Sequence, residues 1–193
     1  FLGQGTEIST VKRVYSEFLG SQVRSAQTTK SGLDSYYTQI KQIDNMLADP
    51  AAGLSSALQS FFSGVQELTS NPASIPVRQT ALSSAESLAS RFQSMAGRLD
   101  EMGQGINSQI TSSVAVVNTY AQQIAQLNDA IGRVQSPTGQ PPNDLIDQRD
   151  QLILDLNKEI KTTVVKQSNG DFNVFIGNGQ PLVVDVTTFS LST

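Results

Sequence analysis

Three aspartates stand at every third residue of the stretch NDLIDQRD, at Asp144, Asp147 and Asp150, with Arg149 beside the last. Carboxylates at this spacing lie on neighbouring parts of one helix face, and three of them could hold Ca²⁺ or Mg²⁺. A metal-dependent hydrolase is therefore one hypothesis. The stretch nevertheless lacks the glycine and glutamate of an EF-hand loop, and the chain has no His for a metalloprotease helix.

The same stretch is typical of the start of a helix. Asn143 or Asp144 would cap the first turn, and Asp147 would take the third place of a capping box. Acids in a first turn also complement the positive end of the helix dipole. Arg149 can pair with an acid of another helix or near Glu159 only through a tertiary contact, which the sequence does not show. The inward stripe is expected at Leu145, Leu152 and Leu156, widened by Ile153 and Ile160.

We favour this structural interpretation and predict no catalytic residue, no metal ligand and no cofactor. The predicted helix-start motif consists of Asn143, Asp144, Asp147, Gln148, Arg149 and Asp150. Three other stretches could also be binding sites, and for each we favour a structural role. GNGQ (177–180) lacks the Lys-Ser/Thr that ends a phosphate loop, so we expect a hairpin loop. The aromatic residues of DSYYTQI (34–40) and FF (61–62) are expected in the core.

Composition narrows the function classes. The chain of 193 residues has no Cys, His or Trp, which excludes disulfides, thiol nucleophiles, Cys/His zinc sites and imidazole triads. Its net charge of -4 argues against nucleic acid. Charged residues make up 16%, against about 25% in an ordinary domain, which suits close subunit packing. No run of 18 apolar residues occurs, so we expect no helix that spans a membrane. Phe1-Leu2-Gly3 resembles no signal peptide, which suggests a fragment or processed product.

Most of the chain has helical periodicity. Apolar residues at steps of three and four predict helices over roughly 14–48, 54–69, 75–135 and 143–159, after a possible short strand in 4–11. Asp49-Pro50 and Asn71-Pro72 end the first two. For the second helix we expect six residues inward: Leu54, Ala57, Leu58, Phe61, Val65 and Leu68. These helices predict a helical rod domain over 1–161.

The third helix carries a heptad pattern that predicts a coiled-coil seam. Its residues are Leu88, Phe92, Met95, Leu99, Met102, Ile106, Ile110, Val117, Ile124, Leu127 and Ile131. The pattern has one extra four-residue step near Val114, which locally unwinds a supercoil. Two helices broken at Gly103-Gln104-Gly105 are the alternative to one continuous helix, which we favour because the pattern resumes in phase. Leu99→Asp or Leu127→Asp should disrupt the rod by burying an unpaired charge.

After Lys161 the period changes to two. The segments 162–167, 171–176 and 181–186 read as strands, joined by a type I′ turn at Asn169-Gly170 and a loop at Gly177-Asn178-Gly179. We therefore expect a three-stranded meander over 162–193 that begins an outer β domain. The fold class is mainly α: a long antiparallel coiled-coil or helical-bundle rod followed by small antiparallel hairpins.

Four stretches together resemble a known family: NDLIDQRDQLILDLN (143–157), VVKQSNGDFNVFIGNGQPLV (164–183), GQGTEISTVKRVYSEFL (3–19) and NPASIPVRQTAL (71–82). They are similar to the hook-associated protein 1 family of the bacterial flagellum, within the flagellin/hook-associated superfamily. The resemblance covers essentially the whole chain.

This resemblance implies a structural subunit of the junction between hook and filament rather than an enzyme. It implies an extracellular flagellar location, reached through type III export without a cleaved signal peptide. The implied partners are other copies in a ring, the hook protein, a second junction protein and an export chaperone bound at a missing C-terminal segment. It further implies that a helix returning from the C-terminal part completes the rod.

A sensory helical bundle that binds a small ligand is the alternative function. The heptads and their irregular step motivate it. Such a sensor would need a membrane segment or a partner kinase.

Overall fold

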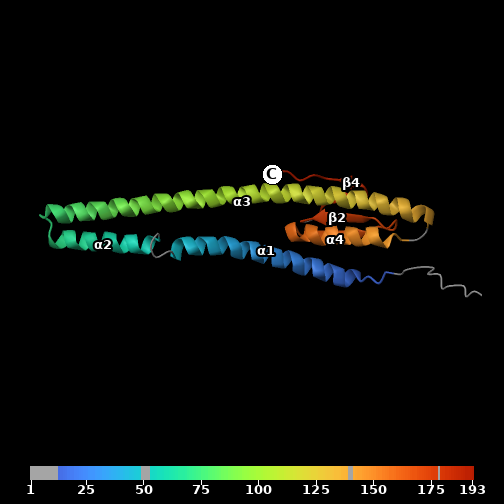
Figure 1. Cartoon of the computed structure of the whole chain (residues 1–193), viewed down its shortest axis with the longest axis horizontal. Helices are drawn as coiled ribbons and strands as arrows, with labels where there is room; N and C mark the ends of the chain where they lie inside the picture. The colour runs from blue at the N-terminus through green and yellow to red at the C-terminus, as the bar shows by residue number, and fades with distance from the viewer. Residues whose placement is uncertain (1–12, 49–52, 139–140, 178) are drawn as a thin grey trace, which may run out of the picture. The chain divides into compact units, whose positions relative to one another are not determined.

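The structure, a computed structural model, describes residues 13–48, 53–138, 141–177 and 179–193. Its elements in order are α1 (Glu17–Ala48), α2 (Leu54–Ser70), α3 (Ile75–Thr138), α4 (Asn143–Glu159), β1 (Thr162–Lys166), β2 (Phe172–Ile176), β3 (Gln180–Val184) and β4 (Thr187–Thr188) (Figure 1). The prediction of a mainly α chain followed by a small antiparallel sheet is confirmed. The expected strand in 4–11 and the break at Asp49-Pro50 lie outside the described residues.

The chain divides into two compact units, Phe1–Gly32 with Ser113–Thr193, and Leu33–Ser112. Helices α1 and α3 contribute residues to both. The sheet shares the first unit with α4 and with the C-terminal half of α3. The division into a rod domain over 1–161 and a β domain from 162 stays a prediction.

The start of α1 has a clear local cause, and α3 is continuous. Helix α1 begins at Glu17, three residues later than predicted from Val14. Ser16 explains the difference, because its Oγ accepts from the N–H of Leu19 at 3.4 Å and its carbonyl accepts from the N–H of Gly20 at 2.9 Å. A serine in this position caps a helix. Helix α3 runs unbroken past Gly103 and Gly105, so the alternative of two helices does not occur.

In the second unit, small residues allow α2 and α3 to approach closely. Ala57, Gly64 and Ala81 are buried. A Cβ added at Gly64 would lie 3.3 Å from the backbone of Ala81. The predicted inward position Val65 is 39% exposed, because the adjacent glycine takes the contact face.

The aromatic pairs of this unit are only partly in the core. Phe61 is half-buried and packs edge-to-face on Phe62, with ring centroids 5.5 Å apart, but Phe62 is 64% exposed. The prediction that DSYYTQI supplies core residues is wrong, since both tyrosines are about two-thirds exposed. Tyr37 lies nine residues from the buried Met46, which is half a turn around a helix.

In the first unit, α3, α4 and the sheet enclose one hydrophobic core (Figure 1). Its buried residues are Val117, Ala121, Ile124, Ala125, Ile153, Leu156, Phe172, Val174, Ile176, Leu182 and Val183. The sheet is antiparallel in the order β1-β2-β3-β4. The predicted inward residues Ile153 and Leu156 are thus buried, while Leu152 and Ile160 pack against the cluster as partly buried neighbours.

The sheet differs from the predicted meander in two details. The β1–β2 loop is no type I′ turn, because Asp185 is the only non-glycine residue with positive φ among those described. Instead Gly170 (φ 91°) closes a three-residue loop, and the N–H of Gly170 donates to the carbonyl of Gln167 at 3.0 Å. Such a loop is a type I turn followed by a glycine bulge. The second difference is at Asp185 (φ 53°), where the chain turns and adds the fourth strand.

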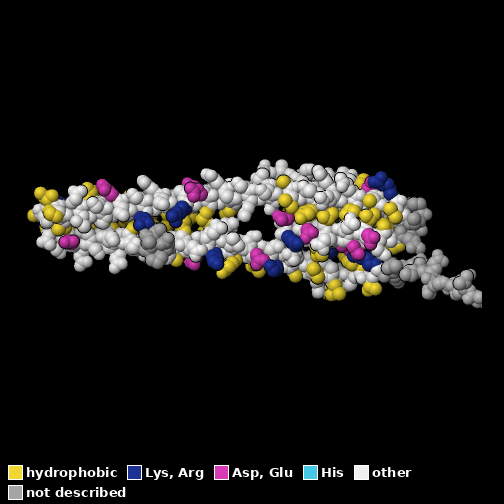
Figure 2. Space-filling view, in the orientation of Figure 1, with side chains coloured by type: hydrophobic (Ala, Val, Ile, Leu, Met, Phe, Trp, Pro, Cys, Tyr) yellow, Lys and Arg dark blue, Asp and Glu magenta, His cyan; other side chains and the backbone are white. Residues whose placement is uncertain are grey.

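The predicted seam differs in burial between the two units. Val117, Ile124 and Ile131 are at most 3% exposed, and Leu127 is half-buried. Leu88, Met95 and Met102 are half-buried. Four seam residues are more open: Phe92 50%, Leu99 46%, Ile106 38% and Ile110 50%. Hydrophobic side chains accordingly reach the surface of both units (Figure 2), and the seam as a coiled-coil contact stays a prediction.

Candidate functional site

The helix-start motif does begin α4, but its capping differs from expectation. Pro142 is the N-cap residue and makes no side-chain cap. Its carbonyl accepts from the N–H groups of Leu145 and Ile146, both at 3.1 Å. The prediction that Asn143 or Asp144 caps the helix is therefore wrong, because both already lie inside the first turn. The exposed Asp144 still places a negative charge near the positive helix end.

The other two aspartates converge on a cation that precedes α1. Arg13 Nε lies 2.8 Å from Asp147 Oδ1, and Arg13 Nη2 donates to Asp150 Oδ2. Burial acts to lower the pKa of Arg13, but the hydrogen bond and charge of Asp150 and the charge of Asp147 outweigh it and raise that pKa. These acids therefore tie the stretch before α1 to α4.

This geometry gives no support to the metal-dependent hydrolase hypothesis. Two of its three carboxylates bind a guanidinium, and the third, Asp144, is exposed. Within residues 13–48, 53–138, 141–177 and 179–193, no group of three acidic side chains is placed to hold a metal ion. Gln148 lies exposed on the same turn of the helix.

Arg149 points the opposite way, into the interior. It is 2% exposed, and its Nη1 donates to Asn128 Oδ1 at 2.8 Å and to the carbonyl of Gly170 at 3.0 Å. Its guanidinium carbon lies 3.7 Å from the centroid of the Phe172 ring, a cation–π contact. Both acceptors are neutral oxygens, so these tertiary contacts of Arg149 are not a pairing with an acid. Burial lowers the pKa of Arg149, partly offset by the charges of Asp150 and Asp171.

Asn128 on α3 completes this arrangement. It is 1% exposed, and its Nδ2 donates to the carbonyls of Phe172 at 3.0 Å and Asp185 at 2.7 Å. Its Oδ1 accepts from the Phe172 N–H at 3.2 Å and from Arg149. We call Asn128, Arg149 and the backbone of Gly170, Phe172 and Asp185 the buried polar hub. It joins α3, α4 and the sheet at one point.

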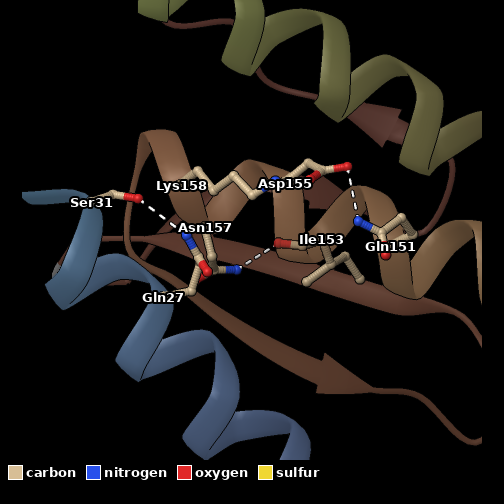
Figure 3. Close-up of polar contacts among 7 residues, drawn as sticks. All are labelled: Gln27, Ser31, Gln151, Ile153, Asp155, Asn157 and Lys158. Carbon is tan, nitrogen blue, oxygen red and sulfur yellow. Dashed lines mark hydrogen bonds and ion pairs between the residues drawn. The ribbon is translucent and has the colours of Figure 1, made fainter. Parts of the chain in front are cut away.

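Two further asparagines make similar contacts. Asn157, 1% exposed near the end of α4, donates to the Ile153 carbonyl and to Thr162 Oγ1, both at 2.7 Å. Figure 3 shows Asn157 on α4, beside the Gln27–Ser31 turn of α1. Thr28 of that turn donates to the Asn157 carbonyl at 2.8 Å.

Asn118 on α3 holds the last residues of the chain. Its Nδ2 donates to the Leu191 carbonyl at 3.0 Å, and its Oδ1 accepts from the Leu191 N–H at 2.9 Å. Sequence reasoning singled out none of the three asparagines. A signal for Asn128 exists, because it stands four residues after Ile124 and three before Ile131, within the apolar stripe.

Comparison with known proteins matches this fold and motif to one family. The family model for the flagellar hook-associated protein FlgK helical domain matches residues 40–193. This chain belongs to that family. The resemblance inferred from its motifs is thereby confirmed. The matched region includes Asn128, Arg149 and Asn157 and begins after Arg13.

Relatives agree with this assignment. Flagellar hook-associated protein 1 of Salmonella typhimurium is 42% identical over 193 residues, and that of Escherichia coli K12 is 38% identical over 193 residues. Each alignment covers 100% of this chain and 35% of the relative, so the chain spans about a third of these proteins. The structure of the flagellar hook junction protein FlgK from Burkholderia pseudomallei superposes with a TM-score of 0.80 at 39% identity, covering 88% of this chain and 30% of that one. In the described part of this FlgK-family chain, no helix has both the length and the apolar character to cross a bilayer.

Proposed function

We propose that the protein containing this chain is a structural subunit of the bacterial flagellum that forms the junction between hook and filament. It acts by subunit packing and not by catalysis. Membership of the FlgK helical-domain family is the observation that carries this proposal. The relatives named hook-associated protein 1 and the hook junction protein from Burkholderia support it.

The geometry of the site agrees with a mechanical role. The side chains of Asn118, Asn128 and Asn157 bind backbone groups of other elements, as does Arg149. Such contacts hold elements together. The sensory-module alternative gains no support from the relatives.

We further propose that the predicted coiled-coil seam is covered in the assembled protein. Phe92, Leu99, Ile106 and Ile110 are between 38% and 50% exposed in this chain. Half-exposed apolar residues in a repeating row are typical of a contact surface. The proposed partners are other copies in a ring, the hook protein and a second junction protein. An export chaperone would bind a C-terminal segment outside this chain.

The proposed location is extracellular, on the flagellum, after export without a cleaved signal peptide. A strain that lacks the gene tests the proposal. Electron microscopy should show hooks without attached filaments, and the full-length protein should restore the filaments. Normal filament attachment in the deletion strain would refute the junction role.

A pair of full-length variants separates contact from folding. Leu99 is 46% exposed in this chain, so the prediction that Leu99→Asp disrupts the rod by burying a charge does not hold for it. Leu99→Asp should leave the 193-residue chain folded, yet in the longer protein it should reduce filament attachment. Gln104→Glu, an exposed change on the same helix, serves as the control. Full attachment with Leu99→Asp would contradict the proposed seam while leaving the junction role in place.

A further inference from the structure

The β1–β2 hairpin carries an Asn-Gly pair at its turn, Asn169-Gly170. Asn169 is exposed, and Gly170 has a φ of 91°. An asparagine followed by glycine is more open than other asparagines to attack on its side-chain amide by the next backbone nitrogen, because glycine has no Cβ to obstruct the approach. The contacts around this pair decide whether the folded hairpin permits that reaction.

The reaction is an intramolecular substitution with loss of ammonia. The Gly170 nitrogen forms a bond to Cγ of Asn169 while the bond from Cγ to Nδ2 breaks, and Nδ2 leaves as ammonia with the proton of the Gly170 N–H. A cyclic imide results. Water then opens the ring at either carbonyl, which gives an aspartate, or an isoaspartate whose main chain runs through the side-chain carbons. Water is the only co-reactant.

Hydrogen bonds of the native hairpin restrain both reacting groups. The N–H of Gly170, which must lose its proton, donates to the carbonyl of Gln167 at 3.0 Å. Asn169 Nδ2, the leaving nitrogen, donates to Asp171 Oδ2 at 2.6 Å, and Asn169 Oδ1 accepts from the Asp171 N–H at 3.0 Å. Attack on Cγ requires a free amide and a deprotonated nitrogen, so these bonds must open first. Local opening of the hairpin therefore controls the reaction.

The products would disturb the contacts around the buried polar hub. An aspartate at position 169 replaces the donor Nδ2 by an oxygen that faces the carboxylate of Asp171. Burial raises the pKa of Asp171, and the hydrogen bond from Asn169, which the reaction removes, acts to lower it. An isoaspartate adds a carbon atom to the main chain beside Gly170, whose carbonyl accepts from Arg149 at 3.0 Å. Both products therefore weaken the turn that Arg149 contacts.

We propose that Asn169 is a site of spontaneous deamidation, that opening of the β1–β2 hairpin controls its rate, and that the product loosens the hairpin at the buried polar hub. The hydrogen bonds of Asn169 and Gly170 slow the reaction in the folded chain. They do not abolish it, because Asn169 lies in an exposed loop, and such loops open at a lower free energy than the core. The proposal does not depend on the junction role.

The first test compares the 193-residue chain, folded and unfolded in guanidinium chloride, during incubation in mildly alkaline buffer. Peptide mass spectrometry with isoaspartate detection follows the loss of Asn169. The folded chain should react about tenfold more slowly, as expected when three hydrogen bonds near the low end of the usual range must open first. Asn178-Gly179 is an internal reference, since the two Asn-Gly pairs should react at similar rates in the unfolded chain.

Two variants of the same hairpin test the restraint on the amide. Asp171→Ala removes the acceptor of Asn169 Nδ2 and should speed the reaction in the folded chain about two- to fivefold. Ser168→Ala, an exposed change in the same loop that removes none of these bonds, should leave the rate unchanged. Each rate is divided by that of the same variant unfolded, so that a direct effect of the new side chain cancels. Circular dichroism checks that both variants fold, and the wild-type comparison does not require them.

Hydrogen exchange measures the effect of the product on the hairpin. Asn169→Asp, which reproduces the aspartate product, should raise the exchange rate of the Gly170 N–H about fivefold, as expected for one lost hydrogen bond. The N–H of Ile160, which donates to the Leu156 carbonyl at 2.9 Å at the end of α4, should keep its rate and serves as the control.

Four results would overturn the proposal. Equal rates in the folded and unfolded chains would show that the hairpin does not control the reaction. Complete retention of Asn169 in the folded chain, while the unfolded chain reacts fully, would show that it is no modification site. A reaction that Asp171→Ala slows or leaves unchanged would show that the Asp171 carboxylate does not restrain the amide. An unchanged Gly170 exchange rate in Asn169→Asp would remove the effect on the hairpin.

Discussion

Replacing Asn128 with alanine should destabilise the first unit more than any exposed substitution on α3. The change removes four hydrogen bonds, two donated to the Phe172 and Asp185 carbonyls and two accepted from the Phe172 N–H and Arg149. A net hydrogen bond contributes about 1 kcal/mol, and one to a charged group about 1.5–3 kcal/mol. Because the bonds are coupled, we expect a total loss of about 3–5 kcal/mol.

Urea denaturation followed by circular dichroism measures this loss. Gln126→Ala is the matched control, since it removes an exposed amide two residues away on the same helix and should change stability by less than about 0.5 kcal/mol. Hydrogen exchange adds a local readout, because the Phe172 N–H should lose protection in Asn128→Ala. Equal stability of the two variants would refute the role of the hub, and so would an unchanged exchange rate at Phe172.

Three other substitutions test packing and charge. Leu99→Asp should lower the free energy of unfolding by less than about 1 kcal/mol, because Leu99 is 46% exposed. Ile124→Asp, at a position 0% exposed, should lower it by about 4 kcal/mol or more. Urea denaturation midpoints compare the two variants, and a large loss in Leu99→Asp would contradict the exposure of Leu99. Gly64→Leu should destabilise the α2–α3 contact by about 1–3 kcal/mol, measured by thermal melting, since a Cβ there already lies 3.3 Å from the α3 backbone. The pKa of Asp155 is held below its ordinary value mainly by the hydrogen bond from Lys158. A lowered carboxyl pKa gives stability that is present above the ordinary value and is lost as pH falls through the folded one. The stability difference between wild type and Asp155→Asn should therefore shrink from neutral pH towards about pH 3, and a difference that grows on acidification would contradict it.

Local sequence rules were sufficient for several element boundaries. Helix α2 begins at Leu54 and α4 at Asn143, both as expected. The signals for these starts, a preceding proline and the onset of helical periodicity, lie within a few residues of the boundary. The Asn169-Gly170 pair correctly indicated a hairpin but not its turn type. That pair is compatible with more than one turn, and the Gly170 carbonyl is also bound by Arg149. The local residues do not determine the type of this turn, and a tertiary contact from Arg149 accompanies the type that is observed.

The buried polar hub could not be predicted, for a different reason. Arg149 bonds to Asn128 and to Gly170, each 21 residues away in the chain. Helical periodicity places Arg149 on a face of α4 but does not identify the acceptor opposite. A neutral acceptor is also the less common partner for a buried cation, so general principles alone would point to an acid. Helical periodicity does put Asn128 in line with Ile124 and Ile131, so its inward position was the part of the hub open to prediction, although it was not predicted.

The hub contributes more to specificity than to net stability. A buried cation usually costs more to desolvate than its contacts return, and an apolar side chain at position 149 could pack with similar stability. Apolar contacts are less directional than hydrogen bonds, so the hub adds a geometric constraint on how the sheet lies on α3. Asn128 binds both the N–H and the carbonyl of Phe172, and it also binds the carbonyl of Asp185. A shift by one residue would break all three bonds and leave the Asn128 amide buried without partners. The polar residues thus oppose neighbouring registers in addition to the apolar packing of the same elements.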